Sequence, residues 1–165
     1  MAGDGMGYSG DKHQKGEQVI AITDHHGDVL SPFPVAPVHE PELVLLPEGL
    51  QALKRVAKTG GLTLTGAYLN LDAGVESTHH RTGMFNAGLI PNLPENPRNR
   101  QHTKRGRKRV FNAAIHVLRT RVDRTCAWED KFKRLLLRFE HRQPRHVGMK
   151  WLAYTWINVR EFCGA

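Results

Sequence analysis

The chain has 165 residues, of which 39% are hydrophobic, and this is enough for one domain with its own core. Its formal net charge of +8 and isoelectric point near 9.9 favour a polyanionic partner. No apolar run approaches the ~20 residues of a membrane span, and the first residues lack an apolar signal core, so we expect a cytoplasmic protein without a membrane partner.

The first 16 residues are rich in glycine and lack a periodic apolar pattern, which predicts a flexible tail before a domain at residues 17–165. Residues 18–22 and 28–30 flank the turn-forming segment 24–27, a pattern typical of a β-hairpin. Prolines then predict that the second strand leaves as an extended edge or loop: Pro32, Pro34, Pro37 and Pro41.

A helix is predicted over residues 43–58, and the glycine pair at 60–61 ends it. Its buried side consists of Leu45, Leu46, Leu50, Leu53 and Val56. Residues 62–72 follow as an apolar strand that finishes on an acidic residue, Asp72.

A second strand is expected at residues 89–93, after a short helix that Ser77 or Thr78 can cap and that Gly88 ends. The order strand, helix, strand implies a parallel pair within a mixed sheet. The chain is therefore expected to have an α/β fold, with a mixed sheet flanked by helices.

The carboxyl-terminal third is expected to be helical after a linker at residues 94–109. Residues 110–140 predict one long amphipathic helix, and residues 149–162 a final helix. The stripe of the long helix that should face a core consists of Phe111, Ile115, Leu118, Val122, Phe132, Leu135, Leu136 and Phe139.

Polar residues off that stripe fall at spacings of 3, 4 and 7, which return them to one helical face: His116, Arg119, Asp123 and Asp130. Imidazole, guanidinium and carboxylate groups on one face suggest metal-assisted chemistry on phosphate. A plainer interpretation is that Arg119 and Asp123 form an ordinary surface ion pair, worth ~0.3–0.5 kcal/mol.

Positive charge is concentrated in residues 98–124, where Asp123 is the single acid. Such a local excess is typical of a nucleic-acid-binding surface, although a solvated loop or, less readily, a membrane-surface patch has the same composition. The basic residues are Arg98, Arg100, Lys104, Arg105, Arg107, Lys108, Arg109, Arg119, Arg121 and Arg124.

Two carboxylates could form a metal site. Asp72 follows a strand, at the edge where open α/β sheets place ligands, although an aspartate there can equally stabilise the turn toward Gly74. Together with Asp123 it would offer the oxygen ligands that Mg²⁺ prefers. The two cysteines, Cys126 and Cys163, have no zinc spacing and no disulfide framework, which favours a reducing compartment.

Several long segments resemble the carboxyl-terminal part of a DDE insertion-sequence transposase: residues 16–36, 69–74, 85–100, 104–109, 121–137 and 153–164. The resemblance implies a ribonuclease-H-like fold. It also implies DNA transposition by Mg²⁺-dependent (or Mn²⁺-dependent) DNA cleavage and strand transfer, a recombination reaction on double-stranded DNA ends and target.

The resemblance also assigns the acids. The second catalytic acid of the family lies in an Asp-x-Gly segment, here Asp72 to Gly74, although Val75 replaces the usual aromatic residue. The third lies in the pattern Tyr, two residues, Arg, three residues, Glu, six residues, Lys. That pattern falls on His116, Arg119, Asp123 and Asp130, so three of its four positions differ, with a lysine one place late at Lys131.

The first acid of the family lies in an Asp-Gly-Thr segment on the first strand, and this sequence contains no such tripeptide. We therefore expect a truncated copy that lacks the first strand. Four other aspartates are poor substitutes, because they occupy the tail or the hairpin tip: Asp4, Asp11, Asp24 and Asp28.

Three functional hypotheses follow from the sequence. The first is a transposase in which Asp72 and Asp123 are catalytic metal ligands, while DNA phosphates are bound by Lys104, Arg105, Arg107, Lys108, Arg109 and Arg119. The second is a non-catalytic remnant that binds DNA, or that pairs with intact transposase subunits and inhibits them. The third, a basic RNA-binding module, lacks the interleaved aromatic residues that base stacking requires.

Overall fold

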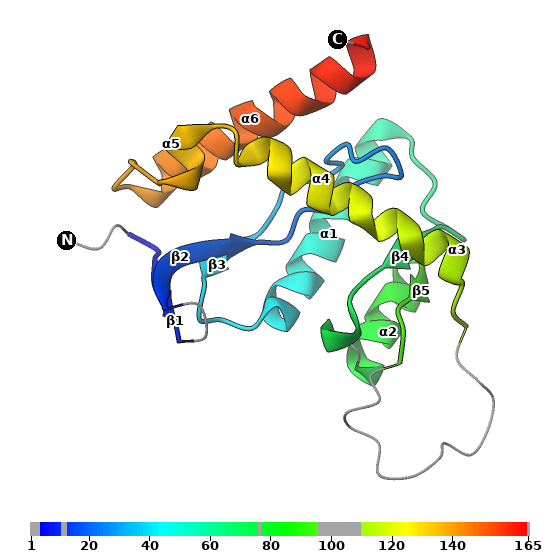
Figure 1. The fold of residues 1–165 in the computed structure, drawn as a ribbon. Helices are drawn as coiled ribbons and strands as arrows, with labels where there is room; N and C mark the ends of the chain where they lie inside the picture. The colour runs from blue at the N-terminus through cyan, green and yellow to red at the C-terminus, as the bar shows by residue number, and fades with distance from the viewer. Residues whose placement is uncertain (1–3, 11–12, 76, 96–109, 165) are drawn as a thin grey trace. The chain divides into compact units, whose positions relative to one another are not determined.

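The computed structural model, drawn in Figure 1, describes residues 4–10, 13–75, 77–95 and 110–164. The chain divides into two compact units: Met1–Leu53 with Thr120–Ala165, and Lys54–Arg119. Helix α1, Glu42–Gly60, contributes residues to both. The described residues contain strands and helices in both units, so the fold is mixed α/β, as the sequence pattern predicts.

The first unit contains a three-stranded antiparallel sheet in the order β1–β2–β3. These strands are β1 (Gly7–Ser9), β2 (Gln14–Val19) and β3 (Val35–Pro37). β3 lies at the edge of this sheet, where a proline is tolerated. The extended edge predicted from the proline-rich segment is therefore confirmed.

The prediction of a flexible tail over residues 1–16 is wrong for β1 and for the start of β2. Gly7 pairs with Gly16, and Tyr8 pairs with Lys15. The ladder of backbone hydrogen bonds forms this hairpin without an apolar stripe, so a search for hydrophobic periodicity misses it.

The predicted hairpin around residues 24–27 is confirmed, although its ladder is short. The N–H of Asp24 donates to the carbonyl of Asp28 at 3.0 Å, and Thr23 pairs with Val29. One carboxylate oxygen of Asp24 accepts the N–H groups of the three residues at positions 26–28, at 2.8, 2.9 and 3.0 Å. Asp24 therefore acts as a turn residue.

Three helices complete the first unit: α4 (Thr120–Glu129), α5 (Lys133–Leu136) and α6 (Gln143–Cys163). α6 begins six residues before its predicted start and ends at Cys163, where Gly164 caps it with a left-handed φ of 67°. The aromatic ring of Phe33 packs between two side chains of α6, stacked at 4.9 Å on Trp151 and edge-on at 5.1 Å to Tyr154. The aliphatic core of this unit consists of Ile22, Leu45, Leu46, Leu50, Leu53 and Leu135.

Charged groups are buried beside that core in two connected clusters. In one, the guanidinium of Arg138 donates to Glu17 at 2.8 Å, and Nε2 of His146 lies 2.9 Å from the other carboxylate oxygen of Glu17. In the other, Lys150 and Tyr154 both donate to the carboxylate of Glu129. Buried charges are tolerated only when paired in this way.

The second unit pairs β4 (Tyr68–Asn70) with β5 (Ile90–Asn92) in parallel, as predicted. Helix α2, Thr78–Asn86, connects them. Met84 of α2 is fully buried, together with Leu89 and Leu93 on either side of β5. β4 is much shorter than the strand predicted over residues 62–72, because Gly66, with φ of 82°, turns the chain just before it.

The predicted boundaries of α2 are confirmed. Ser77 is its N-cap, and its hydroxyl accepts the N–H of His80 at 3.1 Å. Gly88 follows the helix with φ of 81°, a conformation that glycine adopts without strain.

The prediction of one long helix over residues 110–140 is wrong. The segment forms α3 (Ala113–His116), the 3₁₀ turn η3 (Val117–Arg119), and then α4 and α5. The N–H of Phe132 bonds to the carbonyl of Glu129 at 2.9 Å, which tightens the chain into a turn after α4.

The predicted apolar stripe of this segment is also largely wrong, since only Leu135 among its members is buried. No aliphatic stripe residue lies between Val122 and Phe132. There α4 instead buries Thr125 and Glu129, whose polar groups have hydrogen-bond partners. The exposed members of the stripe are Phe111, Leu118, Phe132, Leu136 and Phe139.

Candidate functional site

Asp72 and Arg119, separated by 47 positions in the sequence, form an ion pair in the second unit. Nη1 of Arg119 donates to Oδ2 of Asp72 at 2.9 Å. The Asp72 side chain is 63% exposed, so the pair contributes about 0–1 kcal/mol to stability. The interaction therefore matters for the position of the two groups more than for folding.

Local hydrogen bonds hold Asp72 at the carboxyl end of β4. The chain leaves β4 after Asn70 and turns through the 3₁₀ helix η1, Ala73–Val75. The carbonyl of Asp72 accepts the N–H of Val75 at 3.1 Å. Asp72 therefore lies at the strand end predicted from the sequence, with its carboxylate directed to Arg119.

Three asparagine side chains hold in place the segment that leads to Arg119, the second member of the ion pair. Nδ2 of Asn92 donates to Oδ1 of Asn70 at 2.7 Å and to the carbonyl of Asn112 at 3.0 Å. Its Oδ1 accepts the N–H of Asn112 at 2.7 Å. Asn112 also caps α3 by accepting the N–H of Ile115 at 3.2 Å. This network joins β4 and β5 to the start of α3, the helix that leads to Arg119.

Asp123 lies in the first turn of α4, where a carboxylate interacts favourably with the positive end of the helix dipole. It belongs to the first unit, whereas Asp72 belongs to the second. Asp130 immediately follows α4, and its N–H bonds to the carbonyl of Cys126 at 3.0 Å. A metal shared by Asp72 and Asp123 stays a prediction.

A Mg²⁺ centre of the kind that the resemblance implies requires three acidic residues. In the part of the chain that the structure describes, no group of three or more His, Cys, Asp or Glu side chains gathers as metal ligands. The carboxylate of Asp72 is engaged by a guanidinium instead.

The remaining residues singled out from the sequence are the basic run at 104–109, His116 and the two cysteines. The basic run Lys104, Arg105, Arg107, Lys108 and Arg109 lies outside the described residues. His116, on α3, packs 5.2 Å from the ring of Phe111. Both Cys126 and Cys163 are free thiols. None of the helices in the described ranges is long and apolar enough to cross a membrane.

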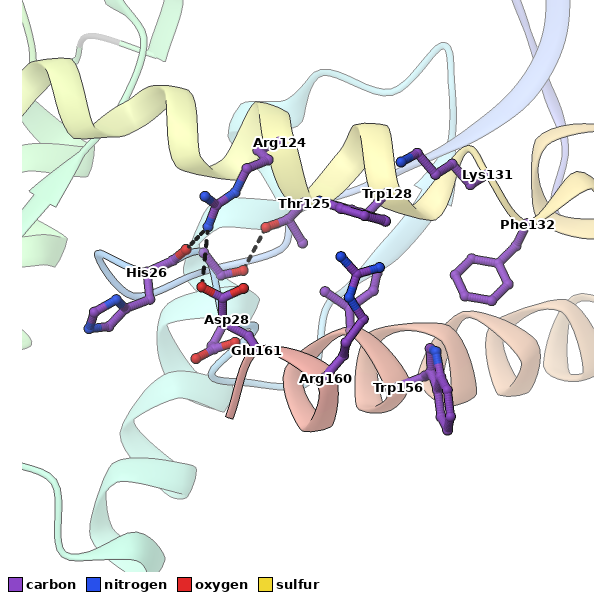
Figure 2. Close-up of a pocket in the computed structure, with 12 residues that line it drawn as sticks. His26, Asp28, Arg124, Thr125, Trp128, Lys131, Phe132, Trp156, Arg160 and Glu161 are labelled. Carbon is purple, nitrogen blue, oxygen red and sulfur yellow. Dashed lines mark hydrogen bonds and ion pairs between the residues drawn. The ribbon is translucent and has the colours of Figure 1, made fainter. Parts of the chain in front are cut away.

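A pocket of about 150 Å³ in the first unit was not predicted from the sequence (Figure 2). It is lined by residues of α4, α6, the turn after α4 and the hairpin tip, among them Asp28, Arg124, Trp128, Phe132, Trp156 and Arg160. The sequence does contain a signal for it. Trp156 and Arg160 are four positions apart on α6, a spacing that places side chains together on a helical face.

Two hydrogen bonds connect the hairpin tip to α4 at one end of this pocket. The hydroxyl of Thr125 donates to the carbonyl of Gly27 at 2.6 Å, and the guanidinium of Arg124 donates to the carbonyl of His26. Burial raises the pKa of the Asp28 carboxyl, and the neighbouring carboxylates of Asp24 and Glu161 raise it further.

Comparison with family models, with curated proteins and with solved structures finds no match for this chain.

Proposed function

We propose that this chain is a DNA-binding protein of the DDE insertion-sequence transposase type, with a ribonuclease-H-like fold, which does not cleave DNA by itself. The observation that supports this most directly is the ion pair of Arg119 with Asp72. The sequence resemblance names Asp72 as a catalytic acid and Arg119 as a DNA-binding residue, and these two residues lie 2.9 Å apart although 47 positions separate them.

The parallel pair β4–β5 gives further support, because Asp72 follows β4 at the edge where such sheets place ligands. The strands of the first unit form a separate antiparallel sheet. In the described residues the strands thus form two sheets, not the single mixed sheet that the resemblance implies. The net charge of +8 favours DNA as the partner.

Loss of cleavage is proposed because the sequence lacks the Asp-Gly-Thr segment and has Asp123 where the family has glutamate. An aspartate is one methylene shorter, which changes the reach of the carboxylate. In-line displacement at phosphate uses two metal ions, and these need more acidic ligands than Asp72 and Asp123 provide.

The first test measures DNA binding. Purified full-length chain is titrated into a fluorescein-labelled 30-base-pair duplex at several salt concentrations, and anisotropy reports the fraction bound. We expect a Kd that rises steeply with salt. A Kd that does not change with salt, or no binding at low salt, would contradict the proposal.

The second test measures cleavage. The chain is incubated with supercoiled plasmid and with labelled DNA ends of the element, in Mg²⁺ and in Mn²⁺. We expect no nicked or joined product. Activity that Asp72→Ala abolishes would make the chain a competent transposase, whereas activity that survives Asp72→Ala would come from a contaminating nuclease.

Inhibition of an intact transposase is the second candidate role, and it rests on the same resemblance. It predicts that added chain lowers strand transfer by the complete enzyme in proportion to its concentration. An in-frame Asp-Gly-Thr segment in the DNA before the Met1 codon would favour a complete enzyme over an inhibitor.

A further inference from the structure

The pocket in the first unit has the size of one flat ring system. Its volume of about 150 Å³ is well below the ~300–1,000 Å³ typical of pockets for drug-sized ligands. The hydrogen bonds of Thr125 and Arg124 to the hairpin tip form one end of it, so that end is already built in the unliganded chain. The space suits a group of about the size of one ring system.

The other end of the pocket combines aromatic rings with positive charge. The ring of Trp128 has the Lys131 ammonium 3.5 Å from its centroid and the Arg160 guanidinium 3.7 Å from it. Figure 2 shows the Arg160 side chain reaching from α6 toward Trp128 on α4. A cation on an aromatic face keeps its full charge, so this end attracts anions.

Two further aromatic side chains line the pocket and reach solvent. Phe132 is 37% exposed and Trp156 is 63% exposed. Figure 2 shows the Phe132 ring near α6, while Trp156 projects from α6 away from α4. Large exposed aromatic rings beside cations form the stacking platforms with which proteins bind unpaired bases. The expectation from the sequence that aromatic residues are not interleaved with basic ones is therefore wrong for this pocket.

The pocket combines aromatic side chains, which suit a flat ring, with cations, which suit an anion. A nucleotide has both a flat ring and an anionic phosphate. In a duplex, both faces of a base are covered by neighbouring base pairs, so a paired base offers no face to these aromatic rings. The carboxylates of Asp28 and Glu161 at the opposite end can accept hydrogen bonds from the amino group of a base.

We propose that this pocket binds one unpaired nucleotide of a DNA strand, with its base against Phe132 and Trp156 and its phosphate near Lys131 and Arg160. The pocket thereby adds recognition of a strand end or distorted site to the proposed function, on which it rests. Duplex binding through phosphates alone would not require it.

The test compares three labelled DNAs that share one duplex. The first is blunt, the second has a two-nucleotide single-stranded end, and the third has the same end with abasic nucleotides. The second and third have equal phosphate charge, so their affinity ratio isolates the base. We expect the end with bases to bind roughly 5- to 150-fold more tightly than the abasic end.

Variants then locate the base. Phe132→Ala or Trp156→Ala should reduce the ratio toward one, and Trp156→Phe should restore much of it. Leu136→Ala and Leu152→Ala are matched controls, because these side chains are 58% and 66% exposed and do not line the pocket. Circular dichroism verifies that each variant is folded. A ratio near one in the wild type, or a ratio unchanged in both aromatic variants, would overturn the proposal.

Two outcomes separate this inference from the proposed function. Salt-dependent binding of blunt duplex without any preference for bases would contradict the pocket alone. A preference for bases without binding of blunt duplex would contradict the proposed function alone. If deoxyadenosine monophosphate competes as well as DNA with the single-stranded end, the ligand of the pocket is a free nucleotide and not a DNA strand. That result would overturn the proposal.

Discussion

Glu17 and Arg138, 121 positions apart in the sequence, form an ion pair in the interior of the first unit. Their atoms Oε2 and Nη1 are 2.8 Å apart, and the two side chains are 5% and 7% exposed. The pair links β2 to the segment after α5. Desolvation raises the pKa of the Glu17 carboxyl, and the positive charges of Arg138 and Lys150 oppose that shift.

Arg138→Met should destabilise the chain by about 3–5 kcal/mol, because it leaves the Glu17 carboxylate buried without its guanidinium. Urea unfolding followed by circular dichroism measures the change. Arg134→Met is the matched control, since Arg134 pairs with Glu140 while 64% exposed, and its loss should change stability by less than about 1 kcal/mol. If both substitutions lower the free energy of unfolding by the same amount, burial of the Glu17–Arg138 pair does not increase its effect on stability.

Acidification should destabilise the first unit through His146. Burial and the positive charges of Lys150 and Arg138 lower the pKa of this imidazole from 6.5 to about 4. A histidine with a lowered folded pKa binds its proton more tightly when unfolded, so stability falls as pH drops from about 6.5 toward 4. The loss from pH 7.5 to pH 5 should be about 2 kcal/mol.

The carboxylates of Glu129 and Glu140 also act on His146 and partly offset this shift in its pKa. The raised pKa of Glu17 has the opposite sign, because it favours the folded state at lower pH. Urea unfolding at intervals between pH 7.5 and pH 5 tests the balance. His146→Gln should flatten the profile in that window, and an equally steep profile in the variant would assign the pH dependence to other groups.

The elements that the sequence predicts correctly are those specified by local chemistry. Ser77 caps α2 through its own hydroxyl, and Gly88 ends the helix because it accepts a positive φ. Both effects act within a few residues, so the sequence alone reveals them. The strand-end position of Asp72 is predictable for the same reason.

The elements that the sequence mispredicts depend on distant partners. α4 buries Thr125, whose hydroxyl bonds to a carbonyl 98 positions away, and Glu129, whose partners lie 21 and 25 positions away on α6. Periodicity assigns such polar residues to solvent and requires an aliphatic stripe instead. The pairing of Arg119 with Asp72 is likewise not visible from helical spacing, which offers Asp123 as the partner.

Asn92→Ala should destabilise the second unit by at least about 2 kcal/mol. The asparagine is completely buried, and its removal leaves Oδ1 of Asn70 and the backbone N–H of Asn112 without a partner. Hydrogen exchange should accelerate at residues 112–119. Thr82→Ala is the control, because its exposed hydroxyl bonds only within α2. Unchanged exchange in the Asn92 variant would mean that α3 is held by other contacts.

Arg119→Ala should weaken duplex binding uniformly across DNA sequences and reduce the salt slope by about one, if this guanidinium contacts a phosphate. Arg55→Ala on α1 removes the same charge elsewhere in the second unit and is the comparison. Asp72→Asn should act in the opposite direction, because it removes the carboxylate that engages Arg119. If the Arg119 and Arg55 substitutions have equal effects on DNA binding, Arg119 contributes only through the net charge and not through a specific phosphate contact.

The basic run before α3 should supply most of the salt dependence of DNA binding. If it neutralises about five phosphates, the plot of log K against log salt should have a slope near −4.5. Simultaneous replacement of the five basic residues of this run by alanine should flatten that slope. These residues are Lys104, Arg105, Arg107, Lys108 and Arg109. The control variant replaces five basic residues of the first unit by alanine, so that both variants have the same net charge. These residues are Lys15, Lys133, Arg134, Arg142 and Arg145. If the slope becomes equally shallow in both variants, DNA binding depends on overall charge and not on this run. If the slope is unchanged in the variant of residues 104–109, the run is a solvated loop that does not contact DNA.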